Sequence, residues 1–197
     1  CLLAEGMLVA IPVPDAVARG YLDAGNLPPD VGIDRLHCSG LYLFQRERTG
    51  DRGSVIDRLR AAADSADGQI SSTRAIEARI QELRGFRAWK HDSLQRAARL
   101  LSRSNESRRS GAILRGDLYR ELGQIDRAEG WYLVAPRMAG LRLGRLYEQR
   151  DQSEEAAASY RRFIEVWGGT GEPWSTAVEE ARERLEKLTV SGRASDD

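Results

Sequence analysis

Residues 113–132 read ILRGDLYRELGQIDRAEGWY, and residues 141–160 read LRLGRLYEQRDQSEEAAASY. Aligned with each other, the two stretches share a glycine, a leucine–tyrosine pair, a glutamine, an alanine and a final tyrosine. A looser third copy consists of Gly85, Ala97 and Leu101, at the same internal spacing. Self-similarity at a period of about 30 residues is typical of stacked repeat architectures, so these stretches decide the fold.

Small and large side chains have different roles in each copy. Two antiparallel helices approach closely only where small residues lie at their crossing, and Gly144 and Ala156 are expected there. Tyr147 and Tyr160 are expected to fill the gap beside the neighbouring helix pair. The complete set of predicted repeat-packing residues is Gly85, Ala97, Leu101, Gly116, Tyr119, Ala128, Tyr132, Gly144, Tyr147, Ala156 and Tyr160.

This pattern resembles the tetratricopeptide repeat over residues 72–188. The resemblance implies an all-α fold, in which antiparallel helical hairpins stack into a short right-handed superhelix. The copies are 31 and 28 residues apart rather than the usual 34, so shortened helices or irregular curvature are expected. The stretch from Tyr160 to Trp167, followed by Val178 to Arg182, also resembles C-terminal repeat regions of bacterial signalling proteins, which are attached to Ser/Thr kinases and signalling ATPases.

Three parts are expected along the chain. Residues 1–50 form an irregular N-terminal arm and the first helices, because the run from Met7 to Pro14 is apolar and interrupted by prolines. Residues 51–188 form the repeat domain, which ends in a capping helix from Trp174 to Leu188. Residues 189–197 form a flexible tail.

Hydrophobic spacing predicts most of the helices individually. Glycines suggest a turn at residues 49–53, and Gly123 suits a left-handed position at a helix end. The clearest antiparallel pair is predicted over residues 138–149 and 153–167.

Composition limits the class of partner. Thirty basic and thirty acidic residues give a formal net charge of zero, so the chain as a whole does not attract nucleic acid or an anionic membrane. Cys1 and Cys38 are candidates for a lipid anchor or a disulfide bond. A lipid on Cys1 would be the one link to a membrane. The alternative is that Cys1 stands first only because the fragment happens to begin at a cysteine.

Catalytic patterns are weak. His37 adjoins Cys38, but neighbours on a helix point about 100° apart and do not form a nucleophile–base pair. His91 falls in a predicted turn, and the glycine-rich residues 168–171 lack the lysine of a phosphate-binding loop. No metal-ligand spacing is present in the sequence. We therefore expect no enzyme activity, cofactor, metal or small-molecule substrate.

Protein binding fits the pattern better. The resemblance implies that the inner helix of each repeat faces a concave groove, with Phe86 and Trp89 as anchors for a partner. For Trp89, a place in the core between helices is the alternative. The predicted groove residues are Arg79, Glu82, Phe86, Trp89, Ile113, Asp117, Arg120, Leu141, Arg145 and Glu148.

Two hypotheses for function follow. In the first, the chain is a non-enzymatic interaction or assembly protein, exported to the cell surface or beyond, that self-assembles head to tail through the arm. In the second, it is a regulatory module of a larger cytoplasmic signalling protein, such as a kinase or a transcriptional regulator. The partner, the oligomeric state and the compartment stay open at this point.

Overall fold

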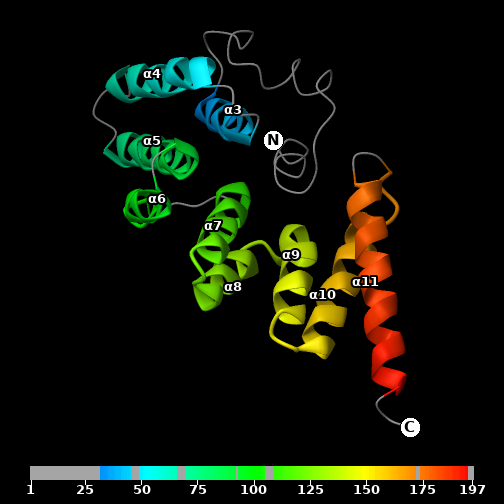
Figure 1. Ribbon diagram of the computed structural model, residues 1–197. Helices are drawn as coiled ribbons and strands as arrows, with labels where there is room; N and C mark the ends of the chain where they lie inside the picture. Colours follow the sequence, from blue (N-terminus) through cyan, green and yellow to red (C-terminus); the bar gives the residue numbers. More distant parts are fainter. Residues whose placement is uncertain are drawn as a thin grey trace. The chain divides into compact units, whose positions relative to one another are not determined.

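The computed structural model describes residues 32–194, apart from residues 46–48, 66–69, 92, 105–108 and 172–173 (Figure 1). Every regular element in these ranges is an α-helix, which confirms the all-α class. The described residues up to Gly111 form one compact unit, and those from Ala112 form another. The predictions for the apolar arm and for Cys1 lie outside the described residues.

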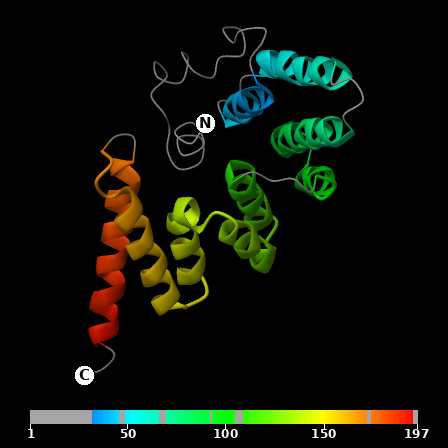
Figure 2. The same cartoon turned by 180° about the vertical axis from the view of Figure 1, so that it is seen from behind.

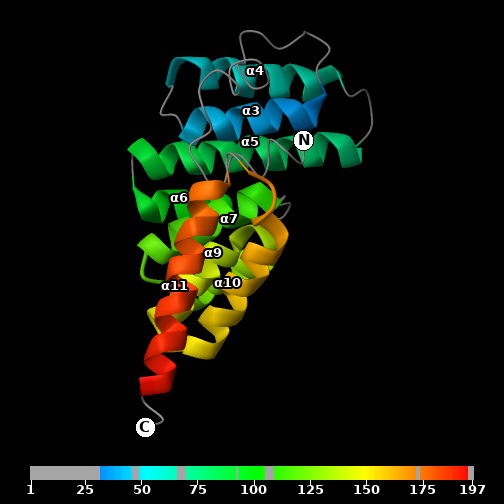
Figure 3. The same cartoon turned by 90° about the vertical axis from the view of Figure 1, so that its right-hand side faces the viewer.

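The first unit is built from four helices: α3 (Ile33–Gln45), α4 (Thr49–Ser65), α5 (Ile70–His91) and α6 (Leu94–Leu101). α3 packs against both α4 and α5, as Figure 3 shows from the side. At one crossing Gly40 lies so close to Leu83 that a Cβ on the glycine would approach Leu83 Cδ1 to 2.7 Å. α3 therefore belongs to the same packed group as α4 and α5.

The turn predicted at residues 49–53 is wrong, because these residues open α4. Val55, Ile56 and Leu59 are buried on one side of this helix. The two glycines in the first turns have a low helix propensity. The packing of the buried side chains stabilises the helix in spite of them, as tertiary packing commonly does.

The boundary between the two units falls inside α7 (Arg109–Glu121), after Gly111. The second unit consists of the rest of α7 and of four further described helices: α8 (Ile125–Leu133), α9 (Pro136–Glu148), α10 (Ser153–Trp167) and α11 (Ser175–Ala194). α9 begins at a proline, whose fixed φ and missing N–H suit the first helical position. α10 packs against both α9 and α11, and the three helices lie in a row in Figure 2.

Three turns close with the same two backbone hydrogen bonds, at α5–α6, α7–α8 and α9–α10. The first bond runs from an amide to a carbonyl five residues earlier: Ser93 to Ala88 (3.1 Å), Gln124 to Tyr119 (2.9 Å) and Gln152 to Tyr147 (3.0 Å). The second bond closes the first turn of the following helix. It runs from an amide to a carbonyl four residues earlier and is 3.0 Å long in all three turns: Ala97 to Ser93, Ala128 to Gln124 and Ala156 to Gln152. In the last two turns the preceding residue is left-handed, with φ of 71° at Gly123 and 58° at Asp151.

The helices of these hairpins touch where the small residues lie. A methyl group at Gly116 would overlap the ring of Tyr132, and one at Gly144 would overlap the ring of Tyr160. At Gly85 an added Cβ would lie 2.5 Å from Leu101 Cγ. The backbone of each first helix therefore lies directly against the large side chain of the second helix.

The last three helices share a core cluster, made of Leu141, Ala156, Tyr160, Phe163, Trp174, Ala177, Val178 and Ala181. Trp174 stacks on Trp167 with ring centroids 3.9 Å apart, which closes the connection between α10 and α11. α11 continues through residues 189–194, beyond the helix end expected at Leu188. No proline follows Leu188 to interrupt the helix, and Leu185 and Leu188 still pack against the cluster.

Candidate protein-binding surface

The side chains of α9 that were predicted to line a groove form one stripe along the helix. Leu141, Arg145 and Glu148 are spaced four and three residues apart, so they share a face. Leu141 is 6% exposed and belongs to the core cluster with α11. Arg145 and Glu148 lie at the edge of the same contact and make ion pairs with α11. This stripe therefore joins α9 to α11.

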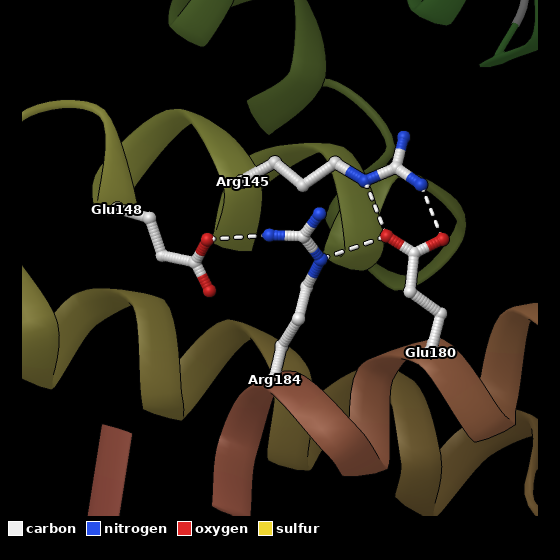
Figure 4. A network of polar contacts seen from close by, with 4 residues as sticks. All are labelled: Arg145, Glu148, Glu180 and Arg184. Carbon is white, nitrogen blue, oxygen red and sulfur yellow. Dashed lines mark hydrogen bonds and ion pairs between the residues drawn. The ribbon is translucent and has the colours of Figure 1, made fainter. Parts of the chain in front are cut away.

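Four charged side chains form a continuous network between these two helices (Figure 4). Arg145 donates from Nε to Oε1 of Glu180 at 2.8 Å, and its Nη2 donates to the other carboxylate oxygen. Arg184 donates from Nε to the same Oε1 at 2.7 Å and from Nη1 to Oε2 of Glu148 at 2.6 Å. Glu180 thus accepts from two guanidinium groups, which fixes the register of α11 on α9.

Two members of this network, Glu180 and Arg184, have pKa values shifted toward their charged forms. Burial is the largest single influence on the pKa of Glu180 and raises it, but the hydrogen bonds and the positive charges of Arg145 and Arg184 together outweigh it. The net pKa of Glu180 is lower than its ordinary value, and the hydrogen bond to Glu180 raises the pKa of Arg184. Because the side chains are 24–36% exposed, solvent screens them, and each pair contributes on the order of 0.2–1 kcal/mol.

A second polar contact joins α7 to α9 with the charges reversed. Asp117 occupies the position in α7 that Arg145 occupies in α9, twenty-eight residues later. Its carboxylate accepts from Nε of Arg142 at 2.9 and 3.1 Å and from the hydroxyl of Tyr132 at 2.7 Å. An acid on α7 thus pairs with a base on α9, whereas a base on α9 pairs with an acid on α11. Exchanging the neighbours would bring like charges together, which favours one order of helices.

Glu129 on α8 makes a third polar contact, with the end of α9. Its carboxylate accepts from the Tyr147 hydroxyl at 2.8 Å and from Nη1 of Arg150 at 2.7 Å. Burial, followed by this hydrogen bond and the charge of Glu129, raises the pKa of Tyr147 to about 12. A tyrosine of the repeat pattern therefore packs in the hairpin and also anchors it to its neighbour.

The predicted groove residues are divided by burial. Four of them are buried and do not line an open surface in this structure: Glu82, Phe86, Ile113 and Leu141. The other six are partly exposed: Arg79, Trp89, Asp117, Arg120, Arg145 and Glu148. Trp89 lies beside Phe86 with ring centroids 6.3 Å apart, and Arg79 forms a 2.7 Å ion pair with Asp34. Within each unit, several of these side chains therefore contact a neighbouring helix instead of lining an open groove.

One buried pair had no signal in the sequence. Nε2 of His37 on α3 lies 2.8 Å from Oε2 of Glu82 on α5, and both side chains are at most 1% exposed. Glu82 is also packed against Gly111, where an added Cβ would overlap the carboxylate. The neighbouring Cys38 is buried too, so pairing with a cysteine of another copy would require α3 to move. Only the packing of α3 against α5 brings His37 and Glu82 together.

In the parts of the chain that the structure describes, no group of three or more His, Cys, Asp or Glu side chains is placed to hold a metal ion. None of the described helices is both long enough and apolar enough to cross a membrane. A scan against protein-family models, a search of curated proteins and a search of solved structures each found no match.

Proposed function

We propose that this chain is a non-enzymatic protein-interaction and assembly protein whose hairpins stack in the manner of tetratricopeptide repeats. The observation that carries the proposal is the recurrence of one local design in three hairpins. The turn hydrogen bonds recur, and so does a glycine placed against a large side chain. Repeating units of this kind are stable only through their neighbours, and they present extended surfaces suited to binding proteins.

The arrangement of charges supports binding rather than chemistry. Several charged groups on the facing helices of the second unit pair with each other, as Asp117 does with Arg142 and Glu180 does with Arg145. Such pairs specify which helix packs where. A general acid or base would instead need a perturbed group directed at a substrate.

The form of assembly that we propose is head to tail, through the N-terminal arm of one copy and a surface of the next. A heterologous contact of this kind does not close on itself and gives filaments. The apolar residues 7–14 supply a segment that gains by docking, and a net charge of zero leaves little repulsion between copies.

Sedimentation velocity over a hundredfold range of concentration tests this proposal. The full chain is expected to sediment faster as its concentration rises, and a chain lacking residues 1–14 is expected to remain monomeric. Replacing residues 7–14 by a glycine–serine segment of equal length controls for chain length. A full chain that stays monomeric throughout, or a truncated chain that assembles equally well, contradicts self-assembly through the arm.

The resemblance of residues 160–167 and 178–182 to repeat regions of signalling proteins favours one alternative, a regulatory module that binds a different protein. The coding sequence upstream of Cys1 separates the two proposals. A signal peptide with a small-residue cleavage site supports an exported assembly protein, whereas a catalytic or DNA-binding domain supports a signalling module.

A further inference from the structure

The outer side of α8 departs from the pattern of the other hairpins. Leu133 and Val134 are adjacent and are 52% and 51% exposed. The equivalent positions of the other two hairpins hold exposed polar residues: Ser102 and Arg103 after α6, and Arg161 and Arg162 in α10. A single exposed apolar residue needs no explanation, but two together where the repeat otherwise has polar side chains indicate a site of contact.

The surroundings of this pair are open and basic. Gly130 lies one helical turn earlier, and a Cβ added to it would meet no atom within 4 Å. We call Gly130, Leu133 and Val134 the α8 patch. The exposed Arg127 precedes the patch and the exposed Arg137 follows it. The nearest acids on α8 are already paired, because Arg150 contacts both carboxylates: Asp126 and Glu129.

The arm has the complementary character in its sequence. Residues 7–14 read MLVAIPVP, an uninterrupted run of apolar residues and prolines. Glu5 precedes this run and Asp15 follows it, so an apolar centre is bounded by an acid on each side. The α8 patch has an apolar centre bounded by a base on each side. Two prolines also restrict the backbone angles open to the unbound segment. Fewer conformations are then lost on docking, which lowers the entropic cost of binding.

We propose that the α8 patch binds residues 7–14 of a second copy of this chain. This inference rests on the proposed function, and it assigns the surface on which head-to-tail assembly takes place. The apolar side chains of the arm cover Leu133 and Val134, while its flanking carboxylates pair with Arg127 and Arg137. Apolar burial supplies most of the affinity, and the charges set the position of the segment.

Sedimentation of three full-length proteins tests the patch. The double variant L133R/V134R copies the arginines that α10 carries at the same positions, and it is expected to weaken assembly about tenfold or more. The matched control is V190R, because Val190 is also an exposed apolar residue, 62% exposed, but lies on α11. The control is expected to assemble like the unaltered chain. Circular dichroism and thermal unfolding verify that both variants fold.

Crosslinking identifies the occupant directly. A benzoylphenylalanine placed at Gly130 has open space, and light-activated products are mapped in a mixture of ¹⁴N- and ¹⁵N-labelled full chains. Crosslinks between light and heavy chains that reach residues 7–14 support the proposal. Products confined to single molecules, products on another segment, or an assembled chain with no product at this site overturn it.

The two proposals fail in different ways. A full chain that remains monomeric at every concentration contradicts self-assembly and removes the docking site with it. A chain that assembles, and loses assembly without its arm, but is unaffected by L133R/V134R keeps the proposed function and rejects the α8 patch. Equal loss of assembly in V190R and L133R/V134R also rejects the patch, because the effect would then not depend on the site.

Discussion

Gly116 and Gly144 are required for a steric reason, because a Cβ atom at either position would overlap the ring of a tyrosine on the facing helix. We predict that Gly144→Ala lowers the free energy of unfolding by about 1–3 kcal/mol, because the ring of Tyr160 must move within a packed core. Gly130→Ala is the matched control. Gly130 is also within a helix but has open space, so alanine there is expected to stabilise the protein by up to about 1 kcal/mol. Urea unfolding measures both changes, and equal effects would refute the close contact.

Tyr147 makes stability depend on pH in alkaline solution. Its pKa is about 12, whereas an exposed tyrosine titrates near 10. Between these values the unfolded chain loses the proton and the folded chain keeps it, so stability falls as pH rises above 10. Burial also raises the pKa of Tyr132 and of Tyr160, which adds to the same slope.

Tyr147→Phe tests this dependence. We predict that the variant is less stable at pH 8, because it loses the hydrogen bond to Glu129, but that its stability declines less steeply from pH 9 to pH 11. Urea unfolding at each pH provides the slopes. Parallel curves for the two proteins would show that Tyr147 ionises equally in the folded and unfolded states.

At the scale of the helix, the network between α9 and α11 is expected to couple Arg145 to Glu180. We predict that Arg145→Glu lowers stability, because two carboxylates then face each other, and that adding Glu180→Arg recovers part of the loss. A coupling energy of about 0.5–1 kcal/mol is expected for this partly exposed pair, and it decreases in high salt. A double-mutant cycle in low and high salt measures it. Additive effects of the two changes would mean that the pair contributes nothing.

The helices themselves were largely accessible to sequence reasoning. Residues 153–167 form α10 as predicted, and α9 begins two residues earlier than expected because Pro136 opens it. Gly123 is left-handed as predicted, but Asp151, which occupies the same place in the next turn, is not a residue that such reasoning selects first. Helix caps, turns and hydrophobic spacing depend on residues that are close in the sequence, which is why the sequence predicts them.

The contacts between helices were much less accessible. Asp117 and Arg145 were both predicted to face a groove, yet Asp117 forms an ion pair with α9 and Arg145 forms one with α11. His37 and Glu82 are far apart in the sequence, and no spacing rule relates them. Which side chains meet across two helices depends on their crossing and register, and a single sequence does not encode those in any local pattern.

For the molecule as a whole, the two sides of α11, the last described helix of the second unit, differ in character. Its inner side supplies Ala177, Val178 and Ala181 to the core cluster, while Glu179, Arg182, Glu183, Glu186 and Lys187 are exposed on the rest of its surface. Terminal units of repeat proteins need such a polar outer face to remain soluble. This charged surface also argues against the outer side of α11 as the docking site for an apolar arm.

We therefore predict that ending the chain after Gly171 destroys cooperative unfolding of the second unit, because Leu141, Tyr160 and Phe163 lose their cover. The truncated protein is expected to bind a hydrophobic dye and to aggregate as its concentration rises. Ending the chain after Leu188 is the control, because that chain retains every residue of the core cluster and its stability should change by less than about 0.5 kcal/mol. Thermal unfolding and dye fluorescence compare the three proteins. If the chain without α11 unfolds at the same temperature as the intact protein, α11 is not the cap of this unit.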